Sequence, residues 1–326
     1  MEIYLAGKTA FELWNNAAIK EERSGHLFDI PADHTPTISK SEANELADRY
    51  RLSLPFEVAV ASAECRRNSK KLSCTTHGAF SPAHQYMKIR GGLFVARPEL
   101  CLMQIAERCT PLELIWRSNI MAGCFTLYKQ EKFKPRWPAT SQLGIVQFME
   151  RCGKCNGKIA MSKALPYVID RSYSPMETVL ALLLCLPRKR GGYGLPLPEL
   201  NKKVKLASLR DPSAPARAFR PDLLWEEQRL IIEYDSAEWH AGERKLASDA
   251  ARRNAFICNG YTVLSMTPDQ LFNQPAMDEL TCFLADALRR PHPSLSTEAI
   301  QQRQTLRAEL FQVAGLEMQS AEAGSE

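Results

Sequence analysis

The chain has 326 residues, 45% of them hydrophobic and 24% charged, with a formal net charge of +5 at pH 7. This composition is typical of a globular protein, and the length allows two domains with separate cores. No apolar run approaches the roughly 18–20 residues of a membrane-spanning helix, so we expect no membrane association. The N-terminus lacks a signal-peptide pattern, which favours a cytoplasmic location. The ten cysteines are then expected to be reduced, packed thiols.

The first domain is predicted to cover residues 1–145 with an α+β fold. No nucleophile, base and acid occur in this half at a recognisable spacing, so its role stays open, with a protein partner as one alternative. Gly91-Gly92 is expected to form a turn between strands. The predicted elements are a strand at 3–5, a helix at 10–20, strands at 56–61, 71–76 and 93–96, and helices at 99–108 and 111–121.

Residues 146–170 are predicted to be a linker with a short helical segment. It follows a polar, proline-containing stretch at 129–142 and carries Cys152 and Cys155. One Cys-x-x-Cys pair supplies only half of a four-ligand zinc site, and no second pair follows at a zinc-finger spacing. We therefore interpret these as two ordinary cysteines near a helix start.

The second domain is predicted over residues 171–290 as an α/β unit, followed by a helical or flexible tail at 291–326. In "SPMETVLALLLCL", Ser174, Pro175 and Glu177 fall at the N-cap, N1 and N3 positions of a helix, which is the capping-box arrangement. The later predicted elements are strands in "FRPDLLW" and "RLIIEYD", a helix that ends at Gly260, a strand at 261–266 and a helix at 276–290.

Acidic residues gather at one end of this predicted strand pair. Asp222 lies near the end of one strand, while Glu233 and Asp235 lie two apart on the next, so their side chains face the same side. A hairpin would bring Asp222 to Glu233. Because a buried, uncompensated charge costs several kcal/mol, such a cluster favours a bound divalent cation, Mg2+ or Mn2+, with oxygen ligands. Glu177 could add a further oxygen.

His240 lies just beyond the acidic strand, and an imidazole there could transfer a proton. Nine basic residues against two acidic ones lie between Arg188 and Arg220, which is compatible with DNA as a polyanionic partner. A solvated basic loop is the alternative. The predicted nucleic-acid contacts are Arg188, Lys189, Arg190, Lys202, Lys203, Lys205, Arg220, Arg252 and Arg253.

The stretch "RPDLLWEEQRLIIEYDSAEWH" resembles the core of the PD-(D/E)XK nuclease superfamily, in particular the very short patch repair (Vsr) endonucleases. The resemblance covers about a third of the chain and implies a restriction-endonuclease-like mixed sheet flanked by helices. It also implies Asp222 and Glu233 as metal ligands, Glu177 as an auxiliary ligand and His240 as the proton-transfer group. Asp235, included among the catalytic candidates, stands where the superfamily has a lysine; the Vsr branch relies on histidine instead.

Three functions therefore stay open. The first is a metal-dependent DNA endonuclease in repair, restriction or phage defence, which the set Asp222, Glu233 and His240 favours. The second is a catalytically inactive nuclease-fold module that binds nucleic acid or acts like an antitoxin, which Asp235 favours. The whole chain also resembles a two-domain bacterial family whose N-terminal part is similar to abortive-infection antitoxins. The third possible function is that of a non-nuclease protein whose acidic strand binds a structural ion. For the later helix we prefer a surface salt bridge of Asp249 with Arg252 and Arg253, or a role in supporting the site residues from behind.

Overall fold

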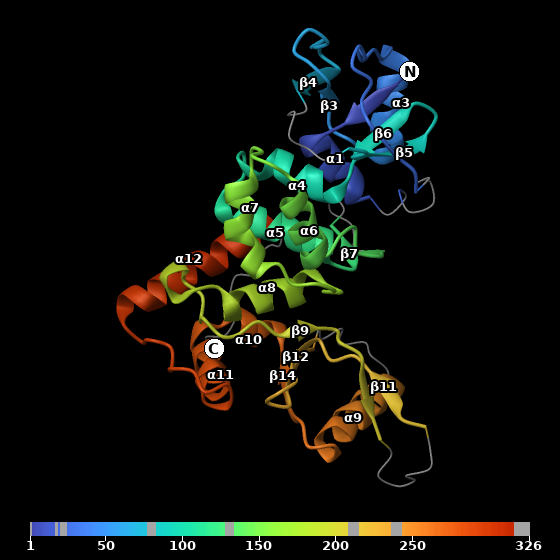
Figure 1. Ribbon diagram of the computed structural model, residues 1–326. Coiled ribbons are helices and arrows are strands. Elements are labelled where there is room, and N and C mark those ends of the chain that lie inside the picture. The colour runs from blue at the N-terminus through green and yellow to red at the C-terminus, as the bar shows by residue number, and fades with distance from the viewer. Residues whose placement is uncertain are drawn as a thin grey trace, which may run out of the picture. The chain divides into compact units, whose positions relative to one another are not determined.

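The computed structural model describes residues 2–16, 19, 25–76, 83–127, 134–207, 215–235 and 243–315. The chain forms two compact units, Met1–Val168 and Ile169–Glu326, and each contains helices and a mixed sheet (Figure 1). Among the described residues, no helix combines the length and apolar character needed to cross a membrane. All ten cysteines are free thiols, as predicted, although they are not all packed, since Cys258 is exposed.

The first unit is built on a six-stranded sheet in which β1 lies between a parallel and an antiparallel neighbour, β6 and β3. The short apolar β1 is fully buried, as expected of a central strand. The Gly91-Gly92 turn connects β5 to β6, and Gly91 has a φ of +52°, which favours glycine. In sheet order the strands are β2 (Leu27–Phe28), β5 (Tyr86–Arg90), β6 (Leu93–Ala96), β1 (Ile3–Leu5), β3 (Phe56–Val60) and β4 (Leu72–Thr76).

The first helix, α1 (Gly7–Trp14), begins and ends earlier than the sequence predicts. Its start is fixed by tertiary contacts, because Gln104 accepts a hydrogen bond from the Gly7 N–H and Glu57 accepts one from the Lys8 N–H. The sequence carries no local capping residue there. A second helix, α3 (Lys40–Tyr50), was not predicted, although Ser39 and Glu42 form its capping box.

The remaining helices of this unit pack around α4, which contacts α1, α5, α6 and α7. The segment 146–170, predicted as a linker with a short helical piece, holds the end of α6 and the whole of α7, and both helices belong to the first compact unit. A small ribbon of β7 (Phe125–Thr126) and β8 (Lys134–Pro135) precedes them. The helices are α4 (Pro98–Ala106), α5 (Pro111–Ala122), α6 (Gln142–Arg151), α7 (Lys158–Ala164) and the 3-10 turn η1 (Leu165–Tyr167).

The second unit contains a four-stranded mixed sheet in the order β14-β13-β12-β9. The predicted hairpin is confirmed: β12 (Leu223–Trp225) pairs antiparallel with β13 (Leu230–Tyr234). Strand β14 (Thr262–Met266) runs parallel to β13, and β9 (Glu199–Leu200) lies antiparallel to β12. The sheet therefore has parallel and antiparallel pairs side by side.

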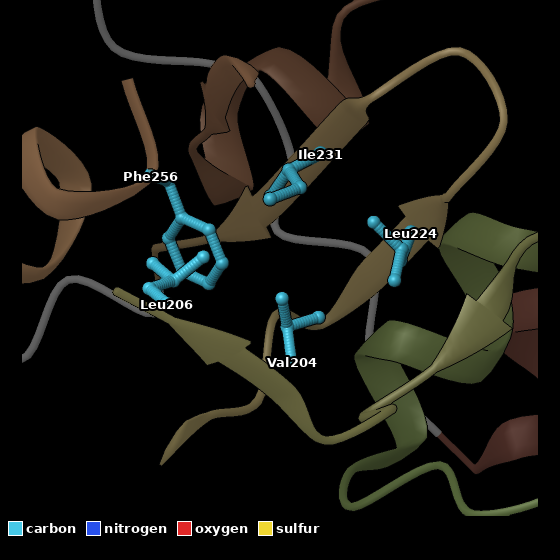
Figure 2. Close-up of a cluster of buried hydrophobic side chains, with 5 residues drawn as sticks. All are labelled: Val204, Leu206, Leu224, Ile231 and Phe256. Atoms are coloured by element: carbon cyan, nitrogen blue, oxygen red, sulfur yellow. The ribbon is translucent and has the colours of Figure 1, made fainter. Parts of the chain in front are cut away.

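Helix α9 (Glu243–Cys258) and a separate ribbon, β10 (Val204–Leu206) with β11 (Arg217–Phe219), pack on this sheet around Phe256. Figure 2 shows Phe256 and the aliphatic side chains of the ribbon and the hairpin pointing toward one another. The helix is thereby fixed over one face of the sheet. The buried cluster consists of Val204, Leu206, Leu224, Ile231 and Phe256.

The apolar helix α8 (Pro175–Cys185) is almost wholly buried and contacts the C-terminal helix α12 (Thr297–Ala314). The latter lies in the segment predicted as a helical or flexible tail, and its inward face, including Leu310 and Phe311, is buried. The other helical elements are η2 (Arg188–Arg190), α10 (Pro268–Phe272) and α11 (Gln274–Ala287).

Candidate active site

The hairpin register brings Asp222 and Glu233 together. Leu223 pairs with Ile232, and Asp222, which directly precedes β12, adjoins Glu233 at the same end of the strand pair. The backbone N–H of Tyr234 donates to Oδ2 of Asp222 at 2.8 Å, which fixes that carboxyl against β13. Burial raises the pKa of Asp222 above its ordinary value.

Glu233 is the most unusual of these carboxyls because it lies within a strand and is only 8% exposed. Burial and repulsion from Asp222 raise its pKa to about 7. Its Oε2 lies 3.3 Å from the guanidinium of Arg252 on α9. Its Oε1 is buried and has no hydrogen-bond partner. A buried carboxylate oxygen without a partner is rare in folded proteins, so it suggests a position for a ligand.

Glu177 lies at the start of α8 and extends toward the same group of acids. Burial and repulsion from Asp222 raise its pKa to about 7. The predicted capping box is only half present: Ser174 accepts from the Glu177 N–H, but the Glu177 carboxylate accepts from the Tyr173 N–H, one residue before the N-cap. The cause is Asn201, whose side-chain amide donates to the same Oε2 at 2.7 Å and draws the carboxylate away.

Two further residues of this group were not predicted. Asn201 follows β9 in a left-handed conformation (φ +50°), which asparagine tolerates, and links Glu177 to Arg220 through its backbone carbonyl. Ser265 on β14 is in register with Glu233, and its hydroxyl is buried without a hydrogen-bond partner. The sequence "YTVLSM" offered no clear signal for Ser265, because β14 is only partly buried and a serine is unremarkable there.

The other two predicted acid–base residues are Asp235 and His240. Asp235 follows the end of β13, where its N–H donates to the Met266 carbonyl and its side chain is exposed. Asp235 therefore lies at the exposed edge of the acidic group, while Glu233 is buried. His240, the predicted proton carrier, lies outside the described residues.

The predicted nucleic-acid contacts do not form one surface patch. Lys202 is engaged by two carboxylates, Glu199 at 2.7 Å and Glu226. Arg252 is paired with Glu233, so the alternative of a salt bridge to Asp249 gives way to a contact with the acids of the sheet. The exposed residues of the set near the sheet and ribbon are Lys203, Lys205, Arg220 and Arg253.

The basic turn η2, which holds Arg188, Lys189 and Arg190, lies at the opposite end of α8 from Glu177. The helix alone separates the two by about 12 Å at 1.5 Å per residue. Side chains on this turn are therefore unsuited to the same phosphate as the acids.

The donor set fits a hard divalent cation. Mg2+ is usually held by one or two carboxylates together with waters and substrate phosphates. Asp222 and Glu233 supply the carboxylates, and the unpartnered Oε1 of Glu233 is the available oxygen. Within the described part of the chain, no group of three His, Cys, Asp or Glu side chains is arranged to hold a metal ion by itself.

Comparison with known proteins gives a partial match. Two uncharacterized proteins from two strains of Mycobacterium tuberculosis (CDC 1551 / Oshkosh and ATCC 25618 / H37Rv) are each 29% identical to this chain over 119 residues. The match covers 36% of this chain, and the chain spans 39% of the length of each relative. No family model and no solved structure matches. Both relatives are described as uncharacterized, so the match suggests no activity for the acidic site.

Proposed function

We propose that the second unit is a Vsr-like nuclease domain of the PD-(D/E)XK type that hydrolyses phosphodiester bonds of DNA with Mg2+ or Mn2+. The observation that carries this proposal is the pair Asp222 and Glu233, which adjoin each other at one end of the hairpin with one buried oxygen unpartnered. A purely structural role leaves the buried carboxyl of Glu233 beside the half-buried Asp222 unexplained. The mixed sheet with α8 and α9 is compatible with a restriction-endonuclease-like core.

Each residue would have a distinct role. Asp222 and Glu233 hold the ion, which supplies Lewis-acid polarisation of the phosphoryl group when bound. Glu177, anchored by Asn201, could add an auxiliary oxygen to the ion. His240 would take up or release a proton.

Arg252 provides a cation beside the second acid. Its guanidinium contacts Glu233, whereas the superfamily lysine would extend from the position of Asp235. A positive charge fixed there lowers the cost of the buried carboxylates and can stabilise charge that develops on a phosphate. The missing lysine is thus compatible with catalysis.

A catalytically inactive DNA-binding module is the second candidate. The pairing of Arg252 with Glu233 favours it, because the same contact could simply neutralise an ancestral site. The first unit adds no catalytic group to either proposal, and we expect it to contact a protein partner.

The deciding experiment is a cleavage assay on supercoiled plasmid, mismatched duplex and single-stranded DNA with Mg2+ or Mn2+. Glu233→Gln, Asp222→Asn and His240→Ala should each abolish cutting. Glu227→Gln removes a carboxylate from the exposed turn of the same hairpin and is the matched control, which should cut like wild type. DNA binding without cleavage by wild type would favour the inactive module; absence of both would reject the proposal.

A further inference from the structure

A second candidate site lies in the same unit, where η2 meets the start of α12. A small cavity of about 30 Å³ is lined there by Arg188, Tyr193, Ser294 and Arg303. None of the described residues that line it is acidic. Its size admits the oxygens of one small group and excludes a nucleobase.

Arg303 is the central residue of this cavity. It is 5% exposed, and its terminal nitrogen donates to the Ser294 carbonyl at 2.8 Å. Its Nε lies 3.0 Å from Oδ1 of Asp278, but the geometry is not that of a hydrogen bond, and this N–H has no other partner. The terminal nitrogen that binds Ser294 also donates to Oδ2 of Asp278 at 3.4 Å, so the guanidinium is paired with this carboxylate while it lines the cavity.

The buried charge around Arg303 is not balanced within the described residues that form this group. Arg303 and Arg307, both under 6% exposed, share the single carboxylate of Asp278. That carboxylate also accepts from the Tyr193 hydroxyl and the Gln274 amide. Burial lowers the pKa of Arg307, which indicates that the positive charge is costly where it is.

The backbone around the cavity is held in place. The chain after η2 packs so closely on α12 that a Cβ on Gly191 would lie 2.2 Å from the Gln302 carbonyl oxygen. Arg188 is fixed by hydrogen bonds to the carbonyls of Tyr193 and Pro291. The first turn of α12, with Ser296 as N-cap, contributes the positive end of its helix dipole. Two guanidiniums and a helix start thus converge on one cavity from fixed positions.

We propose that this cavity binds one phosphate group, held between Arg188 and Arg303. Guanidinium groups present paired N–H donors that match phosphate oxygens, and an anion there would supply the negative charge that the buried arginines lack. The phosphate belongs either to free inorganic phosphate or to the 5′ end of a nucleic acid. The site is distinct from the acids of the hairpin and does not depend on their activity.

The test is phosphate-dependent thermal stability in metal-free buffer, with chloride at equal ionic strength as reference. Wild type should show a saturable rise in Tm. Arg188→Gln should raise the apparent Kd for phosphate by about tenfold, the loss expected for one charge-assisted contact. Lys189→Gln removes the same charge from the neighbouring exposed position, which does not line the cavity, and should bind like wild type.

Arg303→Lys provides a second test because it keeps the charge opposite Asp278 but removes the fork of donors. It should fold and bind phosphate more weakly than wild type. Oligonucleotides with a 5′-phosphate or a 5′-hydroxyl then identify the source: a preference for the phosphorylated end that Arg188→Gln removes assigns a nucleic-acid end, and equal binding of both assigns free phosphate. A linear, unsaturable response that is identical in Arg188→Gln and Lys189→Gln would overturn the proposal.

Discussion

The guanidinium of Arg252 lies 3.3 Å from Oε2 of Glu233, while Oε1 of the same carboxyl is buried without a hydrogen-bond partner. One side of the carboxyl is therefore neutralised and the other is available. This asymmetry determines how protons, cations and substitutions should affect the second unit.

The first prediction concerns pH in the absence of metal. Burial and repulsion raise the pKa of Glu233 from 4.5 to about 7, so the folded chain retains a proton that the unfolded chain has released. The stabilisation of the folded chain by this retained proton is complete below pH 4.5 and is lost as pH rises through 7. Between these two pH values the free energy of unfolding should fall by about 1.4 kcal/mol per pH unit for one proton.

Urea unfolding of wild type and Glu233→Gln between pH 5 and about 8, with a chelator present, measures this effect. The free energy of unfolding of wild type should fall relative to that of the variant over this interval. Parallel pH profiles would show that Glu233 does not hold the extra proton.

The second prediction concerns the cation. Because a carboxylate must lose its proton to bind metal, Mg2+ should stabilise the second unit more at pH 8 than at pH 6. At a hundred times Kd the gain should be about 2.7 kcal/mol. Thermal unfolding with Mg2+ or Ca2+ should show the gain in wild type and in Glu227→Gln, and its loss in Glu233→Gln. An equal Mg2+ effect in all three proteins would mean that the ion binds elsewhere.

The third prediction concerns Arg252. Arg252→Gln should lower DNA cleavage by about 10²–10³-fold, the range measured for loss of one preorganised donor. Asp235→Lys in the same background restores a cation at the position of the superfamily lysine and should recover part of the activity. Single-turnover rates at saturating DNA separate this effect from weaker binding. Unchanged cleavage by Arg252→Gln would exclude its role in the reaction.

The proximity of Asp222 and Glu233 could be predicted because both lie at the same end of two consecutive strands of a hairpin. The register could not, because four residues, 226–229, separate the paired Trp225 and Leu230, where the sequence suggested three. The partners of those acids could not. Arg252, Asn201 and Ser265 come from α9, the end of β9 and β14, and only tertiary packing brings them to the hairpin.

The ends of helices show the same limit. The sequence around Ser174 contains every residue of a capping box, yet Asn201 changes the partner of the Glu177 carboxylate. At α1 the start depends on Glu57, distant in sequence, so local propensity placed it three residues late. Local patterns thus predicted many of the elements but missed others such as α3, while contacts between elements determined their ends and the details of the site.

The fourth prediction distinguishes two lysines among the residues that we propose to contact DNA. Lys202 is already held by Glu199 and Glu226, whereas the side chain of Lys205 is exposed on β10. Lys205→Gln should weaken DNA binding and lower the slope of log K against log salt by about 1, as for one lost phosphate contact. Lys202→Gln should leave the slope unchanged. Fluorescence anisotropy over a salt series measures both, and the reverse order would contradict the assignment.

The fifth prediction concerns how α9, which carries Arg252, is held on the sheet. Phe256 is fully buried against Leu206 and Ile231, so Phe256→Ala should lower the free energy of unfolding by about 3–5 kcal/mol. Ile257→Ala, at a position 50% exposed on the same helix, should change it by less than about 0.5 kcal/mol. Chemical denaturation of the two variants gives the comparison. A similar loss in both would mean that the helix is not anchored through Phe256, and the position of Arg252 beside Glu233 would then lack its main support.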